Sequence, residues 1–463
     1  MRLMSYRLFA ALSLLVGLGA MVAEGRPRYG GTLRVEMREA VRSIDPGDWP
    51  PDAQAAAAKE RLVPLVFETL IRLDENSRPQ PGLALSWRHD SSYKKWRFRL
   101  RPDVVFDDGS VMTVEAVSAA LRPLNESWLV GSDGDVLLVD SDVPVPELPY
   151  DLADPSKSIC LRGDNGRISG TGPFRVAHWG PGRRALLVAN EQYWEGRPFL
   201  DSVAIEMGRS LRDQLLDLEL NRADLVEIWP NEVRRLAQRG AKIRSGAPNI
   251  LVALTFERGR PAAEDPRVRE AVALSIDRAA LHSVLLQKQG EPAAALLPQH
   301  LSGYSYLFSS GADAARARRL ITVPVPPLVL AYDASDPIAR AMAERIAVDA
   351  RGAGLTLQVT GQAAGADMRL ARLPIRSPLP APALAEIASA FHLADLWHPA
   401  PRDTIESLYA TEREMIDSHR IIPLLHLPGT FGSTPRLKSW ATPGVCKSGR
   451  WRLDDMWLDT ETP

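Results

Sequence analysis

Short strand-patterned and helix-patterned segments alternate along the chain, and this alternation limits the fold more than any other feature of the sequence. Residues 174–179 and 185–189 are typical of strands joined by the turn Gly180-Pro181-Gly182. Asp265-Pro266 and Asp336-Pro337 each place a capping carboxylate before a proline at the first helical position. Alternating elements of this kind predict an α/β fold with mixed sheets.

Length and charge narrow the classes of protein that this fold can serve. A chain of 463 residues is long enough for two or three folding units. Lys and Arg total 56, Asp and Glu total 57, and the formal net charge is -1, so we expect no nucleic-acid partner. The two cysteines, Cys160 and Cys446, are too few for a disulfide scaffold or a structural zinc site. We expect neither a metal nor a cofactor.

The first residues have the layout of a secretory signal. Arg2 and Arg7 precede an apolar run over residues 8–22, which small residues and a polar stretch follow. The run is shorter than the roughly 20 residues that a membrane-spanning helix needs, although a permanent anchor is the alternative interpretation. Because no cysteine follows the apolar run, we expect a cleaved signal peptide over residues 1–25 and not a lipoprotein. The mature protein is then expected in the periplasm.

A series of motifs, in a fixed order, resembles the extracellular solute-binding proteins of ABC importers, family 5, the group that binds dipeptides, oligopeptides and nickel. The stretch 98–110 is the most specific of them, since Phe98-Arg99-Leu100-Arg101 leads into Val104-Val105-Phe106-Asp107-Asp108-Gly109. The others are Gly30 to Val35 with Ile44-Asp45-Pro46, Phe67 to Leu70, Pro81 to Trp87, Gly170 to Phe174, Tyr193-Trp194, and Asp265 to Ala271. The chain is identified as a shortened and divergent member of this family.

The resemblance implies a bilobal periplasmic-binding-protein-like fold, of the class II, cluster C type, that closes on a ligand. Lobe I would be discontinuous, over residues 26–45, 168–255 and 425–463, and lobe II would cover 256–424. An extra domain would be inserted over 46–167. Two crossings, near Phe256 and Leu424, would form the hinge. Cys160 and Cys446 would both lie near or in lobe I, where a disulfide between them is topologically sensible.

The sequence departs from the family at two places that bear on the ligand. Members of the family normally carry an aspartate-rich segment after the strand at 355–359, and in the peptide binders one aspartate of the second lobe takes the peptide's amino group. Here Gly365-Ala366-Asp367-Met368 leads instead into a Pro- and Ala-rich run. Phe256-Glu257-Arg258 replaces the family's Phe-Asn-Thr and puts charge beside the expected hinge. These residues do not predict capture of a free amino terminus.

Five side chains are candidates for ligand contact, because ligand sites are concave and apolar with a few oriented polar groups. Trp49, Trp229 and Trp397 are the aromatic candidates, and Glu257 and Asp367 are the charged ones. Packing in a core or between the lobes is the alternative role of each tryptophan.

His392 and His398 do not predict a metal site, since their six-residue offset does not place both rings on one helix face.

The predicted function is therefore a non-enzymatic one. We expect the substrate-binding component of an ABC importer, a monomer that captures a peptide or another small solute and delivers it to the permease subunits. The alternative is a binding fold reused as a sensor or accessory protein without transport. An enzyme is the less expected class, because the sequence contains no G-x-S-x-G, H-E-x-x-H, Walker or Rossmann motif.

Overall fold

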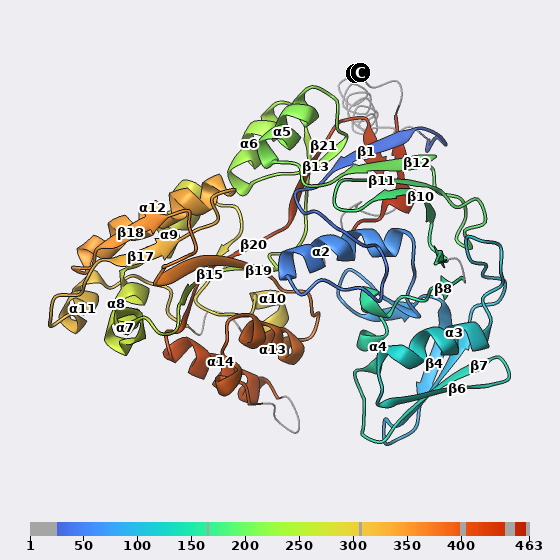
Figure 1. The fold of residues 1–463 in the computed structure, drawn as a ribbon, viewed down its shortest axis with the longest axis horizontal. Coiled ribbons are helices and arrows are strands. Elements are labelled where there is room, and N and C mark those ends of the chain that lie inside the picture. Colours follow the sequence, from blue (N-terminus) through green and yellow to red (C-terminus); the bar gives the residue numbers. More distant parts are fainter. Residues whose placement is uncertain (1–25, 164–165, 305–307, 399–403, 440–449, 460–463) are drawn as a thin grey trace, which may run out of the picture.

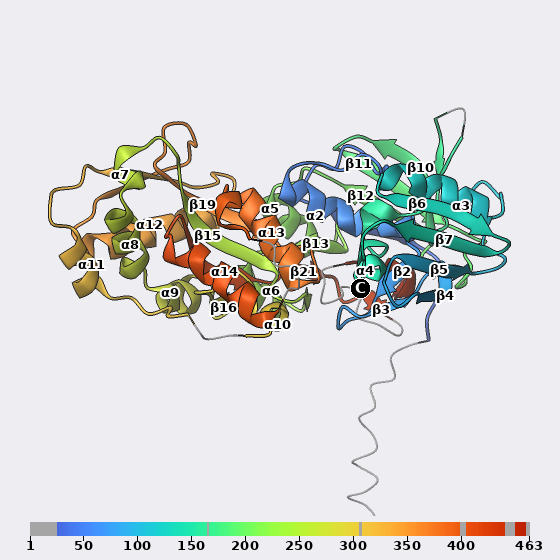
Figure 2. The same ribbon diagram turned by 90° about the horizontal axis from the view of Figure 1, so that it is seen from below.

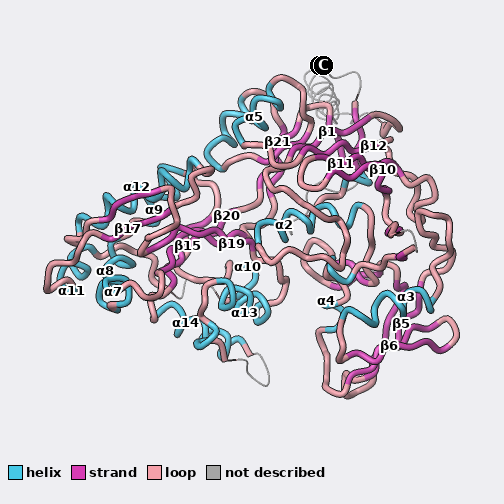
Figure 3. The backbone as a smooth tube through the Cα atoms, viewed as in Figure 1, coloured by secondary structure: helices cyan, strands magenta, loops and turns pink. Residues whose placement is uncertain are grey.

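The computed structural model describes residues 26–163, 166–304, 308–398, 404–439 and 450–459. These residues form one seven-stranded, one six-stranded and one four-stranded sheet, with three two-stranded pairs. The two larger sheets lie in separate lobes side by side (Figures 1 and 2). Helices and strands alternate in both lobes (Figure 3), which confirms the α/β prediction. The expected signal segment, 1–25, and Cys446 lie outside the described residues.

Lobe I is built on the seven-stranded sheet, in the order β10-β11-β12-β1-β13-β21-β14. Strand β1 (Thr32–Glu36) runs parallel to β12 (Ser202–Glu206) on one side and to β13 (Leu225–Glu227) on the other. Val35 lies opposite both Ile205 and Leu225, and all three side chains are buried in the core of this lobe. The remaining elements of lobe I are β10 (Phe174–Gly180), β11 (Arg184–Ala189), β14 (Lys242–Ser245), β21 (Thr430–Ser433), the pair β22 (Leu437–Ser439) and β23 (Met456–Leu458), and helices α5 (Leu211–Glu219) and α6 (Val233–Gln238).

Lobe II is built on the six-stranded sheet, in the order β16-β20-β15-β19-β17-β18. Strand β15 (Ile250–Phe256) pairs antiparallel with β19 (Met368–Pro374) and with β20 (Ile421–Leu427). The other strands are β16 (Glu291–Pro292), β17 (Leu328–Ala331) and β18 (Leu357–Thr360). The helices are α7 (Pro261–Glu264), α8 (Pro266–Ser275), α9 (Arg278–Ala280), α10 (Gln299–Ser302), α11 (Ala314–Leu320), α12 (Pro337–Gly352), α13 (Pro380–Ala390) and α14 (Ile405–Asp417).

The strand pairing moves both expected crossings between the lobes. Strand β15 was expected to end lobe I near Phe256, but it pairs within the lobe II sheet. Likewise β20 continues in lobe II to Leu427, and only β21 returns to lobe I. The crossings therefore lie at residues 246–249 and 428–429. The physical reason is that β15 and β20 are nearly continuous buried strands, whose apolar runs carry no mark of the lobe to which they belong.

A smaller unit with its own apolar core lies beside lobe I, within the stretch 46–167 for which the sequence predicts an inserted domain. Its four-stranded sheet has the order β4-β5-β7-β6 and packs against α3. The division of the chain into these domains stays a prediction. The elements are β4 (Ala84–His89), β5 (Lys95–Leu100), β6 (Trp128–Asp133), β7 (Val136–Ser141), α3 (Val114–Leu121), α4 (Leu148–Asp151), and the pairs β2 (Ile71–Leu73) with β3 (Pro79–Pro81) and β8 (Leu161–Arg162) with β9 (Ile168–Ser169).

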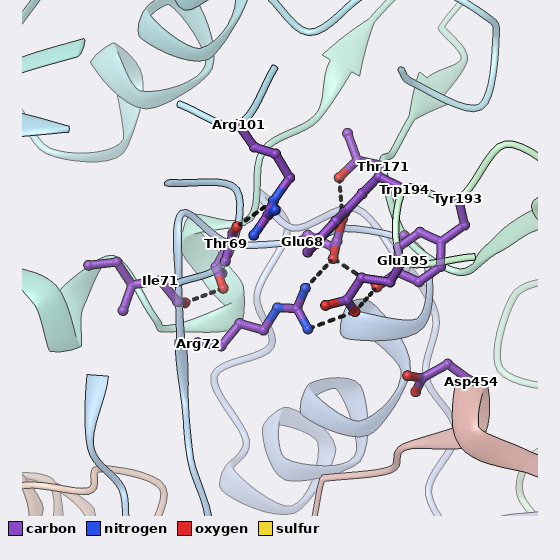
Figure 4. A network of polar contacts seen from close by, with 12 residues as sticks. Glu68, Thr69, Ile71, Arg72, Arg101, Thr171, Tyr193, Trp194, Glu195 and Asp454 are labelled. Atoms are coloured by element: carbon purple, nitrogen blue, oxygen red, sulfur yellow. Dashed lines mark hydrogen bonds and ion pairs between the residues drawn. The ribbon is translucent and has the colours of Figure 1, made fainter. Parts of the chain in front are cut away.

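A buried carboxylate, Glu68, joins this unit to lobe I (Figure 4). Its oxygens accept hydrogen bonds from the Thr171 hydroxyl at 2.9 Å and from the Trp194 indole N–H at 2.8 Å. The Tyr193 hydroxyl donates at 3.1 Å, and the Arg72 guanidinium lies 3.4 Å away. Burial raises the pKa of Glu68, while these four donors oppose that rise. Glu68 of the Phe67–Leu70 motif and the Tyr193-Trp194 motif thus meet in one hydrogen-bonded joint.

Local capping explains where the helices begin. The side chains of Thr113, Ser210 and Asp336 accept hydrogen bonds from the first turns of α3, α5 and α12, and the cap at Asp336 is the one that the Asp336-Pro337 pair predicts. Asp265 caps α8 in the same way, with proline at the first helical position. Helix α2 (Ala53–Leu62), capped by Asp52, buries its inner face in the core of lobe I and reaches β19 of lobe II.

Candidate ligand-binding site between the lobes

The carboxyl ends of two parallel strands of lobe I face lobe II. Arg38 follows β1, and Glu227 and Trp229 stand at the end of β13, the neighbouring parallel strand. In open α/β sheets, ligands bind outside the carboxyl ends of parallel strands, where loops from both sides meet. This edge is therefore the place in lobe I where a binding site is expected.

The two chain crossings between the lobes run next to each other. The Gly246 N–H donates to the Gly429 carbonyl oxygen at 3.0 Å, which ties the first crossing to the second. Asn249 continues this bonding into lobe II, because its carbonyl accepts from the Ile375 N–H at 2.8 Å. Two adjacent short connections allow one lobe to rotate against the other through a few backbone dihedrals. These two crossings, beside the carboxyl edge of lobe I, are therefore the place where a hinge is predicted.

Trp229 brings an indole ring from lobe I against a guanidinium from lobe II. The side chain is only 7% exposed and packs into the core of lobe II. The Arg372 Cζ lies 4.9 Å from the ring centroid, and the Arg38 Cζ lies 5.9 Å from it. Within the described part of the chain, the indole Nε1 is buried without a hydrogen-bond partner. A buried N–H of this kind is a free donor at the junction of the lobes.

Arg372, on β19, is fixed from both lobes. Its guanidinium forms an ion pair with Asp336, the carboxylate that caps α12, at 3.0 Å. Its carbonyl oxygen accepts from the Gln54 side-chain amide, on α2, at 3.0 Å. The side chain of Arg372 is only 22% exposed, and its guanidinium has more N–H donors than the one hydrogen bond to Asp336 uses. Arg372 and Trp229 together line the junction with hydrogen-bond donors.

Arg38 makes the second connection between the lobes. Its guanidinium reaches Asp333 at 2.5 Å and the Ser335 hydroxyl at 3.1 Å, in the loop after β17. On the lobe I side, its backbone N–H donates to Glu227 at 2.8 Å. Burial raises the pKa of the neighbouring Glu39, against the pull of Arg38. The junction therefore holds carboxylates as well as donors, and a polar solute would find both.

Helix α2 supplies a third connection. Glu60 pairs with Arg376 of lobe II at 3.3 Å, and Arg376 also binds Glu386 at 2.8 Å. Burial raises the pKa of Glu60 to about 7, and the positive charges of Arg376 and Arg450 oppose this rise. Glu60 is thus a carboxylate that titrates near neutral pH at the edge of the junction.

Trp49 lies in the loop before α2 and packs against the core of lobe I. The buried Lys59 ammonium lies 5.1 Å from the centroid of the ring and donates to the carbonyl oxygens of Asp45, at 2.6 Å, and Asp48. Burial lowers the pKa of Lys59, while Asp48 and Asp45 oppose that change. The bonds fix the Asp45-Pro46 turn and hold Trp49 in place.

The other three candidates lie elsewhere in lobe II. Glu257 follows β15 and Asp367 precedes β19, so both stand at the end of these strands that is remote from the crossings. Glu257 pairs with Arg369, and Asp367 accepts from the Val329 N–H at 2.7 Å. Trp397 packs beside α13 and α14. The structure brings only Trp229 of the five to the junction, and a ligand-binding role of all five stays a prediction.

Two other sequence interpretations bear on this site. His398 lies 4.0 Å from Glu414, whereas the His392 carbonyl accepts from Arg258 and Arg420. Across the residues that the structure describes, no group of three or more His, Cys, Asp or Glu side chains is placed to hold a metal ion. Cys160 is half-buried against the core of lobe I, and burial raises the pKa of its thiol. Its expected partner, Cys446, lies outside the described residues, so their pairing stays a prediction.

Sequence reasoning missed most residues of the junction. Arg38, Asp333, Arg372 and Glu60 come from four separate stretches of the chain, and no spacing links them. One signal was present, because Asp333 and Asp336 lie at the end of the strand 328–331 and before a proline-capped helix. A strand end followed by a helix cap is a common place for binding residues in α/β folds.

Solved structures with the same fold define the class of protein. The ABC transporter substrate-binding protein CtaP from Listeria monocytogenes aligns with a TM-score of 0.78 and 16% identity, covering 93% of this chain and all of that one. NikA from Staphylococcus aureus, solved with a nickel–histidine complex, aligns at 0.76 and 16% identity, over 92% of this chain and 100% of that one. AppA from Bacillus subtilis, solved with a nonapeptide, aligns with a TM-score of 0.75 and 16% identity, covering 94% of this chain and 100% of that one. The chain has the bilobal fold of substrate-binding proteins.

The sequence comparisons then place the chain within that class. Residues 133–372 match the profile of the bacterial extracellular solute-binding proteins, family 5, and the chain belongs to this family. It is 33% identical to the uncharacterized protein YhjP of Bacillus subtilis, over 36% of this chain and 30% of that protein. It is 23% identical to the nickel-binding protein NikA of Staphylococcus aureus, over 62% and 58% respectively. It is 22% identical to the probable D,D-dipeptide-binding periplasmic protein DdpA of Escherichia coli, over 57% and 55%. The matches thus cover about a third to just over half of the length of these relatives.

Proposed function

We propose that this protein captures a small polar solute between its two lobes and delivers it to the permease of an ABC importer. The observation that carries the proposal is the contact between Trp229 and Arg372, which come from opposite lobes and lie beside the two chain crossings. A solute that contacts both lobes stabilises the closed state by its higher affinity for that state. Release then requires only that the lobes reopen at the membrane.

The chemistry of the junction favours a solute with hydrogen-bond acceptors. The Trp229 indole N–H and the spare donors of Arg372 are mostly buried and point to an oxygen-bearing ligand. Peptides are the first class of solute to test, because DdpA is named for dipeptide binding and AppA was solved with a nonapeptide. The missing aspartate-rich segment argues for including solutes without a free amino terminus in the same test.

Location and partners follow from the same family. The named relatives include periplasmic proteins, and we propose that this chain also works in the periplasm, after removal of residues 1–25. We propose a monomer that docks on permease subunits and has no catalytic role. The second candidate function, a sensor or accessory protein, rests on the sequence departures at 256–258 and 365–370.

Native mass spectrometry of the protein purified gently from a bacterial periplasm tests the proposal. A bound solute appears as a discrete added mass that mild denaturation and dialysis remove. Arg372→Gln should weaken rebinding of the released solute at least tenfold, since a hydrogen bond to a charged group contributes about 1.5–3 kcal/mol. Arg413→Gln is the matched control, because among the described residues Arg413 forms its ion pair with Asp417, along α14, and both side chains are exposed.

Two results would count against the transport role. One is a protein without an added mass that also shows no thermal shift with peptides, sugars and metal chelates, which would favour the accessory role. The other is equal rebinding by Arg372→Gln and Arg413→Gln, which would place the ligand away from the junction.

A further inference from the structure

Arg244 is a half-buried cation of lobe I that meets no carboxylate within the part of the chain that the structure describes. It lies on β14, the edge strand of the seven-stranded sheet, just before the first crossing to lobe II. Its Nη1 donates to the Ser439 hydroxyl at 3.1 Å, while Nε and Nη2 lie 3.5 Å from the Ser433 hydroxyl and Leu437 carbonyl oxygens. Two of these three contacts are longer than ordinary N–H···O bonds, so the protein compensates this cation poorly.

A guanidinium in such surroundings is unusual, because buried charges in proteins are normally paired. Burial lowers the pKa of Arg244 below its ordinary value, and among the described residues no negative charge opposes that change. The arginines of the neighbouring elements are paired with carboxylates, namely Arg34 and Arg436 with Asp224, and Arg61 with Glu227. The surroundings of Arg244 therefore favour a negative group that comes from outside lobe I.

The nearby stretches of sequence supply little negative charge. Residues 440–449, which follow Ser439, contain no Asp or Glu. Asp459, the carboxylate after β23, lies 4.0 Å from the Lys438 ammonium. Beyond it, the sequence contains one further acidic residue, Glu461. Glu461 is thus the alternative source of charge that an experiment has to separate from a free ion.

The two serine hydroxyls add donors to the guanidinium. A hydroxyl that accepts from Arg244 through its oxygen keeps its own hydrogen for another acceptor. The nearest protein acceptor of the Ser433 hydroxyl is the Lys242 carbonyl oxygen, at 3.5 Å, which is too far for a strong bond. Ser433 is fully buried, whereas Arg244 and Ser439 are half-buried, so solvent reaches the guanidinium on the Ser439 side.

Arg278 shows the opposite arrangement. It is only 6% exposed, and its guanidinium meets the carbonyl oxygens of Pro423 at 2.8 Å and of Ala273 and Ser310 at 3.5 Å. Carbonyl oxygens carry partial negative charge and would repel an anion. Arg244 has one carbonyl and two hydroxyls beside it, and a hydroxyl can donate to an anion.

From these contacts we propose that Arg244, Ser433 and Ser439 bind a small oxyanion, of the class of phosphate and sulfate. A guanidinium presents its N–H groups in the planar arrangement that suits such oxygens, and the two hydroxyls add donors without adding negative charge. The ion would link β14, β21 and β22, which carry these three residues. All three strands belong to lobe I, so the site is separate from the junction, and the inference goes beyond the transport role.

Equilibrium dialysis of the full chain tests the proposal, with radiolabelled phosphate and, separately, radiolabelled sulfate in chloride buffer of constant ionic strength. The parent should bind one ion, and so should the matched control Arg413→Gln, whose ion pair lies in lobe II. Arg244→Gln should raise the Kd at least tenfold, because it removes the charged partner of the ion. Ser439→Ala, which keeps the cation, should raise it about fivefold.

Thermal unfolding separates lost binding from lost folding. Because Arg244 has no carboxylate beside it among the described residues, Arg244→Gln should melt at or above the temperature of the parent in chloride buffer. Phosphate and sulfate also stabilise proteins in general, since they are excluded from protein surfaces. Binding at the site predicts that either ion raises the melting temperature of the parent more than that of Arg244→Gln.

Several results would overturn the proposal. One is a parent that binds neither ion saturably, and another is an Arg244→Gln variant with the Kd of the parent. Binding that appears only in Glu461→Gln also overturns it, because the chain's own carboxylate would then occupy the site. Loss of binding in Arg372→Gln but not in Arg244→Gln would place the ion between the lobes instead. None of these results decides the transport role, which the added mass of the solute tests.

Discussion

Replacing Asp224 with alanine should be one of the more damaging single changes in lobe I. The carboxylate is fully buried at the start of β13, and it accepts hydrogen bonds from both neighbours of that strand. Arg34 of β1 donates its backbone N–H, Nε and Nη2 at 3.0, 2.9 and 3.0 Å. Arg436, after β21, donates its Nε and Nη2 at 2.8 and 3.1 Å. Asp224 therefore ties three strands together.

The expected loss follows from this geometry. Removing one partner of a buried ion pair typically destabilises a protein by about 3–5 kcal/mol. The side chains of Arg34 and Arg436 are 38% and 33% exposed, so both guanidinium groups recover part of their hydration. We therefore expect a loss of about 3 kcal/mol for Asp224→Ala, at the low end of that range. Asp224→Asn keeps one acceptor oxygen and should lose about 2 kcal/mol.

Urea unfolding at pH 7, followed by circular dichroism and extrapolated linearly, measures these losses. A pH series adds a second check. Burial by itself would raise the pKa of Asp224, but the bonds from Arg34 and Arg436 lower it below its ordinary value. The stabilisation is thus present above the unfolded pKa of about 3.9 and is lost as the pH falls through the folded value. A loss below about 0.5 kcal/mol for Asp224→Ala at pH 7 would refute the reasoning.

Three further changes test other parts of the structure. Burial raises the pKa of Glu60 to about 7, so the parent should lose free energy of unfolding relative to Glu60→Gln as the pH rises from 5 to 8, by about 2 kcal/mol. A difference between the two proteins that does not change with pH would contradict this. Gly170→Ala should destabilise by about 3 kcal/mol or more in thermal unfolding, since a Cβ would lie 2.0 Å from the Val66 carbonyl oxygen, whereas Gly131→Ala, with nothing within 4 Å, should be near neutral. Glu68→Gln should lose about 2–3 kcal/mol in urea unfolding, because the new side-chain NH2 group would face the hydroxyl of Thr171 and the indole N–H of Trp194, which are donors themselves. An unchanged urea midpoint would contradict this.

Features that depend on a few neighbouring residues could be predicted from the sequence. The caps at Thr113, Ser210 and Asp336 are examples, because a short polar side chain before a helical pattern satisfies the first backbone N–H groups in any tertiary setting. The bilobal fold was implied by the resemblance of the motif series to a known family, and each of those motifs marks a local turn, strand entry or helix start.

Features that depend on tertiary pairing could not be predicted. Strand β6 (Trp128–Asp133) is an example, because Gly131 and polar residues interrupt its pattern and its hairpin with β7 decides its structure. Arg38 and Asp333 are 295 positions apart, so no local pattern records their contact. Trp229 stands out in the sequence as an aromatic residue after a buried strand, and the structure places it at the junction, whereas Glu257 and Asp367 were chosen by charge alone and lie at the far end of lobe II.

Hydrogen–deuterium exchange of the protein as isolated from the periplasm, compared with the same protein after its solute is removed, tests the central claim most directly. Binding between the lobes predicts slower exchange at 227–231 and 369–373, on opposite sides of the junction, and no change in the four-stranded sheet over 84–141. This result is expected because the ligand adds contacts at Trp229 and Arg372. Protection confined to one lobe, or to the region of Glu257 and Asp367, would contradict a ligand site between the lobes.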